Sequence, residues 1–191
     1  MAATVSSSAG TLARTRRAIL DAAIEVFARD TAAAMGEIAR AAEVGRSTLH
    51  RYFPDRSALV RALQVDCAEA AQRLLTEARL DDGPVNEAFR RLVRAMFELG
   101  PRINFLFSEV NSADWDDAAW EQAHIPIARL FQRGQQECYF DCELELDWFI
   151  RTLWYLISAG WESMDEDGVP RYIALDRVIR TLENGVREPR D

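Results

Sequence analysis

The stretch IARAAEVGRSTLHRYF, residues 38–53, decides the fold of the N-terminal part of this 191-residue chain. A short helical segment with small residues comes first, Glu43-Val44-Gly45 forms a tight turn, and a second short segment starts with polar residues. This order is typical of a helix-turn-helix, whose second helix enters the roughly 12 Å wide major groove and presents its first turn to base edges. The stretch therefore predicts a DNA-binding unit.

The distribution of charge supports this prediction. The whole chain has a formal net charge of −8 at pH 7, which taken alone argues against a nucleic-acid partner. Residues 1–62, however, carry a net charge of +3, whereas residues 63–191 carry −11. The basic charge thus coincides with the helix-turn-helix segment, as expected for a nucleic-acid-facing end.

Apolar residues recur with helical spacing along nearly the whole chain, and no segment alternates as a strand would. The pattern predicts an all-α protein with about nine helices. We expect them at residues 12–29, 35–42, 46–52, 56–79, 85–99, around 103–107, 118–139, 144–164 and 171–185. Asp55 is the predicted N-cap of the fourth. We expect a flexible tail over residues 1–10, a DNA-binding domain over 11–62 and a ligand-binding and dimerisation domain over 63–191.

Several classes of protein are disfavoured. No signal-peptide core and no run of 18 apolar residues occurs, so we expect a cytoplasmic protein with no membrane segment. The cysteines (Cys67, Cys138 and Cys142) are odd in number, which favours free thiols over a disulfide framework, with a redox or metal pair at the last two as the alternative. We find no catalytic triad, phosphate-binding glycine loop or metal-spaced cluster, so we expect no enzyme activity, cofactor or metal.

The N-terminal region resembles the TetR family of bacterial transcriptional repressors. The resemblance covers roughly residues 14–63 and rests on a basic helix followed by a fixed set of residues: Ala22, Ala23, Phe27, Ile38-Ala39, Val44, Thr48-Leu49 and Tyr52-Phe53-Pro54. It implies a dimer that presents two DNA-recognition helices. The C-terminal domain diverges widely in that family, so the resemblance names no ligand.

The chain departs from the family pattern at five places. Glu43 stands where the family often has glycine in the turn, and a positive φ there would cost about 1 kcal/mol. Gly45 replaces the usual serine, Arg46-Ser47 replaces a frequent Lys-Gly pair, His50 replaces a phosphate-binding tyrosine, and Ala34 replaces a capping Thr or Ser.

The candidate DNA-binding residues lie mostly in the 46–52 helix. Arg46, Ser47 and Thr48 occupy its first turn, the part that reaches base edges. Arg46 suits guanine O6 and N7, a contact worth about 1–3 kcal/mol of discrimination. Thr48 can offer a methyl group to thymine or a hydroxyl group to phosphate, and Arg51 can contact a base or a phosphate.

Phosphate contacts form the rest of the set. The resemblance implies that His50, Tyr52 and Arg56 hold the DNA backbone. Arg17 lies in an arginine cluster at the start of the first helix, where cations oppose the helix dipole. Facing phosphates would account for that position. The alternative for each of these polar side chains is simple solvation.

The 144–164 helix is apolar on two adjoining stripes: Phe149, Leu153, Leu156 and Gly160, and beside them Ile150, Trp154, Ile157 and Trp161. One stripe can cover the domain's own core, and the other then needs a partner. Pairing this helix and the 171–185 helix with their copies would form a four-helix bundle in a homodimer. Such a dimer would bind a palindromic double-stranded operator with half-sites about 34–36 Å apart.

All five tryptophans lie beyond residue 100, together with several phenylalanines. They are either core residues or the lining of a pocket for an unknown small apolar or aromatic effector. The candidate ligand-binding residues are Phe97, Phe105, Trp120, His124, Phe131 and Trp154. A satisfied core histidine is the alternative for His124. Acidic residues close to aromatic ones would suit a cationic lipophilic ligand.

Together, these features favour a repressor that a ligand releases from its operator. The alternative is a DNA-binding regulator without a small-molecule ligand, controlled by a protein partner or by its own abundance.

Overall fold

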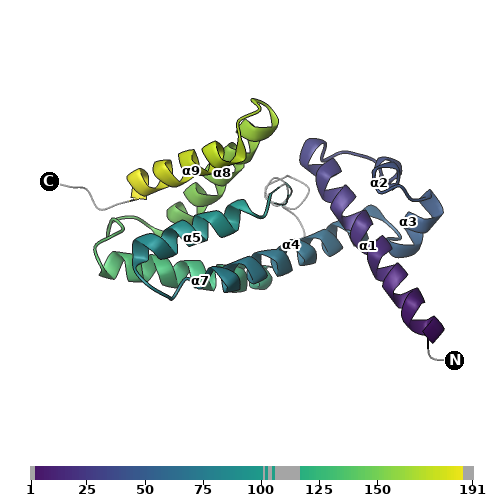
Figure 1. The fold of residues 1–191 in the computed structure, drawn as a ribbon, viewed down its shortest axis with the longest axis horizontal. Helices are drawn as coiled ribbons and strands as arrows, with labels where there is room; N and C mark the ends of the chain where they lie inside the picture. The colour runs from purple at the N-terminus through teal and green to yellow at the C-terminus, as the bar shows by residue number, and fades with distance from the viewer. Residues whose placement is uncertain (1–2, 101, 103–104, 106–116, 187–191) are drawn as a thin grey trace. The chain divides into compact units, whose positions relative to one another are not determined.

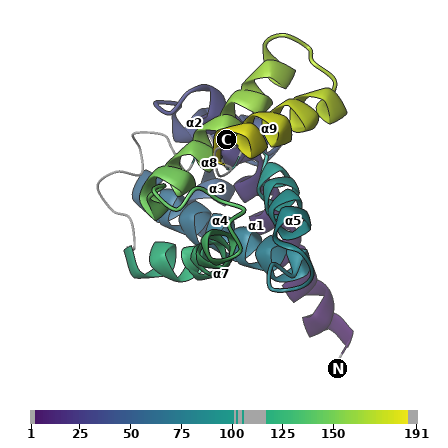
Figure 2. The same ribbon diagram turned by 90° about the vertical axis from the view of Figure 1, so that its left-hand side faces the viewer.

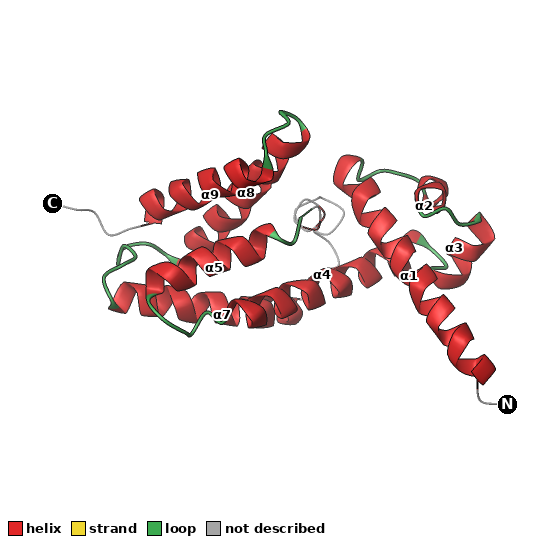
Figure 3. Ribbon diagram, in the orientation of Figure 1, coloured by secondary structure: helices red, strands yellow, loops and turns green. Residues whose placement is uncertain are grey.

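The structure, a computed structural model, describes residues 3–100, 102, 105 and 117–186, and side chains from Gly10 onward except those of 117–121 and 123. Within these residues the chain forms eight helices and no strand, which confirms the predicted all-α class (Figure 1, Figure 3). They are α1 (Ala3–Arg29), α2 (Met35–Ala41), α3 (Arg46–Tyr52), α4 (Arg56–Ala78), α5 (Val85–Phe97), α7 (Asp117–Gln136), α8 (Leu146–Asp165) and α9 (Arg171–Val186). The sixth predicted helix, around 103–107, lies largely outside the described residues.

The first helix begins much earlier than predicted. α1 starts at Ala3, so most of the segment that we expected to be a flexible tail is helical. The segment has no proline, and its alanines favour a helix, whereas its serines and Gly10 suggested a tail. Elsewhere the predicted bounds differ by up to three residues. α7 is continuous through Pro126 and ends at Gln136, shortly before Cys138, which has a positive φ of 52°.

The chain divides into two compact units. Unit 1 contains residues 1–67 and 104–115, and unit 2 contains residues 68–103 and 116–191. The boundary therefore lies within α4, about five residues after the expected position. Phe105, which we had expected in the C-terminal domain, groups with unit 1.

Unit 1 is built on one apolar core. α1 contributes Ile19, Ala23 and Phe27 to this core, and the other three helices add residues from their inner faces. Phe105 is fully buried in the same core, and its ring stacks on Phe27 with centroids 6.1 Å apart. Unit 1 is thus completed by a residue that lies far along the chain.

The turn between α2 and α3 has the geometry that the sequence suggested. Glu43 has a φ of 54°, which is the conformation that glycine adopts at low cost and that carries the strain considered above for a glutamate. The Val44 N–H donates to the Ala39 carbonyl at 2.9 Å, and the Glu43 N–H donates to Arg40 at 3.1 Å. These two bonds satisfy the last carbonyl groups of α2 and stop the helix there.

The predicted cap of α4 is also confirmed. The Asp55 carboxylate accepts a hydrogen bond of 2.7 Å from the Ala58 N–H in the first turn of the helix. This bond satisfies one of the free donors at the helix start. It also fixes the chain direction immediately after α3.

Unit 2 contains α5, α7, α8, α9 and the second half of α4. α8 packs along α9 (Figure 1, Figure 2). Gly160 permits the close approach, because a Cβ there would lie 2.7 Å from Val178 and 2.9 Å from Phe97. None of the described helices is long and apolar enough to span a membrane.

The apolar stripes of α8 differ from the sequence interpretation. Residues of both stripes, including Leu153 and Trp154, are buried within the one chain, so neither stripe as a whole awaits a partner. The large apolar side chains that α8 does expose are Trp148 and Tyr155, with exposed fractions of 60% and 57%. The exposed apolar side chains of α8 therefore lie on neither of the two stripes that the sequence suggested, but on a different side of the helix.

Candidate nucleic-acid interface

α3 presents a polar outer face. Leu49 is its only fully buried residue and anchors the helix in the core of unit 1. Arg46, Ser47 and Arg51 are exposed, whereas Thr48 is half-buried. Gly45 is the N-cap in an extended conformation, with φ −68° and ψ 149°. The first turn therefore faces solvent, where a recognition helix needs it.

An open groove lies between α2 and α3. It is lined by Ala32, Ala34, Met35, Gly36, Glu37, Arg40, Arg46, Leu49 and His50. Arg40, which is exposed on α2, was not among the sequence candidates. Its place three residues before the turn of the helix-turn-helix could have identified it. Three basic side chains, those of Arg40, Arg46 and His50, therefore border one groove.

His50 is oriented by a backbone contact. Its Nδ1 lies 3.1 Å from the Pro54 carbonyl oxygen. A carbonyl oxygen only accepts, so Nδ1 carries a proton, and Nε2 of the neutral ring has a lone pair. Nε2 can donate to a phosphate oxygen only when the ring is an imidazolium. A phosphate contact by His50 thus requires a charged side chain.

Tyr52 is half-buried and lies against Arg51, whose guanidinium carbon is 5.5 Å from the ring centroid. Arg16, on α1, lies in the same way 5.6 Å from the ring of Phe53. Cation–π contacts at exposed sites are weak, about 0.5–1 kcal/mol. Both arginines therefore remain able to turn towards a phosphate.

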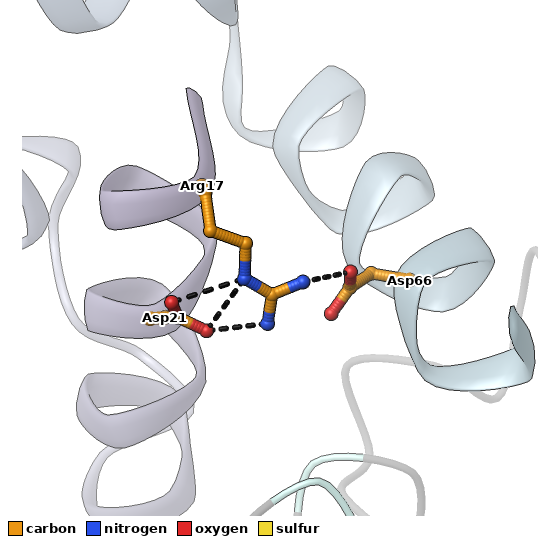
Figure 4. Close-up of polar contacts among 3 residues, drawn as sticks. All are labelled: Arg17, Asp21 and Asp66. Carbon is orange, nitrogen blue, oxygen red and sulfur yellow. Dashed lines mark hydrogen bonds and ion pairs between the residues drawn. The ribbon is translucent and has the colours of Figure 1, made fainter. Parts of the chain in front are cut away.

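The guanidinium group of Arg17 is held by two carboxylates of unit 1. Its guanidinium donates to Asp21 on α1 and, at 2.5 Å, to Asp66 on α4 (Figure 4). Asp66 is only 8% exposed. The hydrogen bond to Asp21 and the charge of Asp66 raise the pKa of Arg17 above its ordinary value, although partial burial opposes this. The side chain joins α1 to α4.

Arg56 has a similar internal role. It donates to the Ala33 carbonyl at 2.5 Å and to the Thr31 carbonyl, both in the loop that precedes α2. Its guanidinium carbon lies 4.5 Å from the centroid of the Phe27 ring. These contacts hold the start of α4 against that loop, a role that the sequence did not reveal.

The geometry agrees with comparisons to known proteins. Residues 19–63 match the model of the bacterial regulatory proteins of the tetR family. The chain is 38% identical over 183 residues to the HTH-type transcriptional repressor LfrR of Mycolicibacterium smegmatis, covering 95% of each protein. The chain belongs to the TetR family. It is a DNA-binding transcriptional regulator and not an enzyme, as the sequence predicted.

Solved structures of TetR-like regulators extend the comparison. The crystal structure of LfrR from Mycobacterium smegmatis in complex with proflavine has a TM-score of 0.72 and 37% identity, covering 93% of this chain and 99% of that one. A structure of the fatty acid degradation regulator FadR from Bacillus halodurans has a TM-score of 0.62 at 19% identity, covering 90% and 99%. The second likeness concerns the fold alone. TetR-family regulators bind DNA operators and small-molecule ligands as dimers.

Two candidate effector residues of this TetR-family chain lie together. The indole Nε1–H of Trp154 donates to Nε2 of His124 at 3.1 Å. An indole nitrogen only donates, so His124 accepts and is neutral, with its ring proton on Nδ1. Both side chains are buried in unit 2. Spacing alone could not pair them, because they come from different helices.

The other candidates of this TetR-family chain lie in different surroundings. Phe131 packs in an aromatic cluster, 4.9 Å from Phe149 between ring centroids. Phe97 stacks on Trp161 at 5.5 Å, and its carbonyl accepts the indole N–H of that residue. Phe105 belongs to the core of unit 1, whereas Phe97 and Phe131 belong to unit 2. The Trp120 side chain is outside the described residues.

Proposed function

We propose that this TetR-family regulator is a repressor that binds a palindromic operator as a homodimer and is released by a small, planar aromatic cation. The observation that carries the proposal is the 38% identity, along 95% of both chains, to a transcriptional repressor. The structure of that repressor was solved with proflavine, which is such a cation. We further propose that the regulator acts in the cytoplasm, where an operator is accessible.

The proposed DNA contacts come from α3. Arg46, Ser47 and Thr48 face base edges in the major groove, because they form the exposed first turn of the helix. His50, Arg51 and Tyr52 follow them and face the phosphates. Their exposed or half-buried side chains support this assignment. Arg17 and Arg56 are left out of the contact set, because internal acceptors already hold both guanidinium groups.

The proposed dimer uses α8 and α9. Trp148, Thr152, Tyr155 and Ala159 follow one another at helical spacing and form an exposed or half-exposed stripe on α8. Tyr172, at the start of α9, is 74% exposed. Two copies that bury these aromatic side chains against each other would form a two-fold interface. A palindrome with half-sites about 34–36 Å apart then matches the two α3 helices.

The proposed effector site includes His124 and Trp154, with Phe97 and Phe131 as further lining residues. An indole face attracts a cation, and the contact is strongest when the pair is desolvated. Release requires the effector to bind the DNA-incompetent state more tightly than the DNA-bound state. An aromatic compound that binds both states equally would change nothing.

A release experiment tests the proposal. An operator is first obtained by selection from random DNA, and proflavine is then titrated into the complex while operator binding is followed by gel shift. Proflavine should lower the operator affinity, and it should also quench the tryptophan fluorescence of the protein when DNA is absent. Undiminished operator binding at saturating proflavine would contradict the proposed release.

Proflavine is planar and can also intercalate into DNA, so the release needs a matched variant. Trp154→Phe keeps an aromatic ring but removes the indole N–H that pairs with His124. This variant should bind the operator like the parent and need more proflavine for release. Equal release of the parent and the variant would assign the effect to DNA or to another part of unit 2.

A further inference from the structure

Gly36 and Arg46 touch across the groove between α2 and α3. Gly36 is the second residue of α2, and Arg46 is the first residue of α3. A Cβ added to Gly36 would lie 3.0 Å from an Nη atom of Arg46, 3.2 Å from its Nε and 3.3 Å from its Cζ. The guanidinium group of Arg46 therefore lies next to the position that a Cβ of residue 36 would occupy. Carbon contacts are most favourable at about 3.5–4.0 Å, so any larger residue would displace the group.

Among the described residues, no ion pair or side-chain hydrogen bond holds the guanidinium group of Arg46 elsewhere. Arg17 and Arg56, in contrast, are each held by two acceptors. The N–H donors of Arg46 are therefore available to DNA, while the bare backbone of Gly36 limits the directions that the side chain can take.

We propose that Gly36 is a specificity-determining residue of operator recognition, because it positions the guanidinium of Arg46. The inference rests on the proposed function, in which Arg46 contacts a base. Two parallel hydrogen bonds to guanine O6 and N7 need donor–acceptor distances of about 2.7–3.2 Å. A displacement of a few tenths of an ångström covers most of that range. Gly36 itself is a positioning residue, since it acts through Arg46.

Gly36→Ala is a suitable probe because it adds only the atom in question. Alanine has a higher helix propensity than glycine, so the substitution does not weaken α2. Gly185→Ala is the matched control. Gly185 also lies in a helix, α9, but a Cβ there would have no atom within 4 Å. Both variants should keep the thermal stability of the parent or exceed it.

The experiment measures base preference at every position of the selected operator. The parent, Gly36→Ala, Arg46→Ala, the double variant and Gly185→Ala are each mixed with operators that carry all single-base changes. The bound fractions are sequenced at one salt concentration. Affinity for DNA without an operator is measured alongside, because phosphate contacts dominate it.

We expect Arg46→Ala to abolish the preference at one base pair in each half-site. Gly36→Ala should lower the preference at that same base pair by about three- to tenfold, a part of the discrimination that a bidentate contact supplies. The double variant should match Arg46→Ala, and Gly185→Ala should match the parent. Binding to DNA without an operator should be the same for the parent and Gly36→Ala.

Two results would overturn the inference. One is a Gly36→Ala profile equal to that of the parent. The other is a Gly36→Ala effect of the same size when Arg46 is already alanine, because Gly36 would then act without Arg46. A parent with no base preference would overturn the proposed function itself and this inference with it, and the parent is measured first for that reason.

Discussion

The outer face of α3 and the junction of α1 with α4 are both rich in arginine, yet they use it differently. On α3, Arg46 and Arg51 are exposed and have no acidic partner among the described residues. At the junction, Arg17 contacts two carboxylates, and Arg56 contacts two backbone carbonyl groups. A basic segment therefore contains two kinds of arginine. The two kinds differ in whether hydrogen-bond acceptors lie next to the guanidinium group. The net charge of the segment does not show this difference.

Phe105 lies in the core of unit 1, on the buried side of this comparison, and its truncation should have the largest effect on stability. Its ring stacks on Phe27, the ring over which Arg56 also lies. Phe105→Ala should lower the free energy of unfolding by about 3–5 kcal/mol, as truncation of a buried phenylalanine does. Chemical denaturation measures the change, and Phe105→Leu should lose much less. A loss below about 1 kcal/mol for Phe105→Ala would remove Phe105 from the core of unit 1.

Arg46 should show the opposite profile. Arg46→Ala should weaken operator binding by about 1–3 kcal/mol, the range for a bidentate base contact. Its unfolding free energy should stay within about 0.5 kcal/mol of the parent, because the side chain is exposed. Fluorescence anisotropy and denaturation measure the two quantities. A stability loss with unchanged DNA affinity would show that Arg46 has a structural role like those of Arg17 and Arg56.

Removal of Arg17, at the junction of α1 with α4, should lower stability and leave operator affinity unchanged. Arg17→Ala would leave the buried Asp66 carboxylate without its arginine, which is costly in a buried site. Because Arg17 itself is 42% exposed, we expect a loss of only about 1–2 kcal/mol of unfolding free energy. Asp21→Asn, which removes the exposed partner, is the matched control and should cost less. An operator affinity that drops while stability holds would show that Arg17 contacts phosphate after all.

His50 should contribute a phosphate contact and no base contact. Its Nδ1 is held by the Pro54 carbonyl oxygen, so Nε2 is the ring nitrogen that can face DNA. His50→Ala should weaken binding to the operator and to DNA without an operator by similar factors of up to about tenfold, because phosphate contacts carry no base preference. Fluorescence anisotropy measures both affinities. A loss confined to one base pair of the operator would make His50 a base-contacting residue.

Gly45 should have the smallest effect. Its position as N-cap of α3 leaves room for a side chain, since the nearest atom to an added Cβ is 3.9 Å away. Gly45→Ser should raise the unfolding free energy by a few tenths of a kcal/mol, because a hydroxyl group can accept an N–H of the first turn. Gly45→Ala adds the same Cβ without the oxygen and should be about 1 kcal/mol less stable than the serine variant. Equal stabilities would mean that no cap forms.

The features that the sequence predicted correctly are local ones. The cap at Asp55 follows from residues within a few positions, as do the bounds of α2 and α3. The start of α1 was wrong because small residues are compatible with both a tail and a helix. For the site, the exposed first turn of α3 followed from the same short-range pattern.

The features that the sequence did not predict depend on residues far apart along the chain. The contact of Arg17 with Asp66 was not predicted, because Asp66 lies on another helix, 49 residues away. Phe105 was assigned to the effector site by composition, whereas it completes the core of unit 1. The exposed stripe of α8 could not be chosen from several apolar stripes until the packing of α9 was known. Periodicity identifies an apolar face but does not identify what covers it.

Operator binding by α3 is best measured by selection of bound sequences from a random DNA pool, followed by a salt series on the enriched sequence. We predict an enriched palindrome with half-sites about one helical turn apart. We also predict an affinity that falls steeply and linearly on a log–log scale as salt rises, because cations on the protein displace counterions from phosphates. A pool without enrichment, bound only weakly at low salt, would contradict an operator-binding regulator that contacts bases through α3.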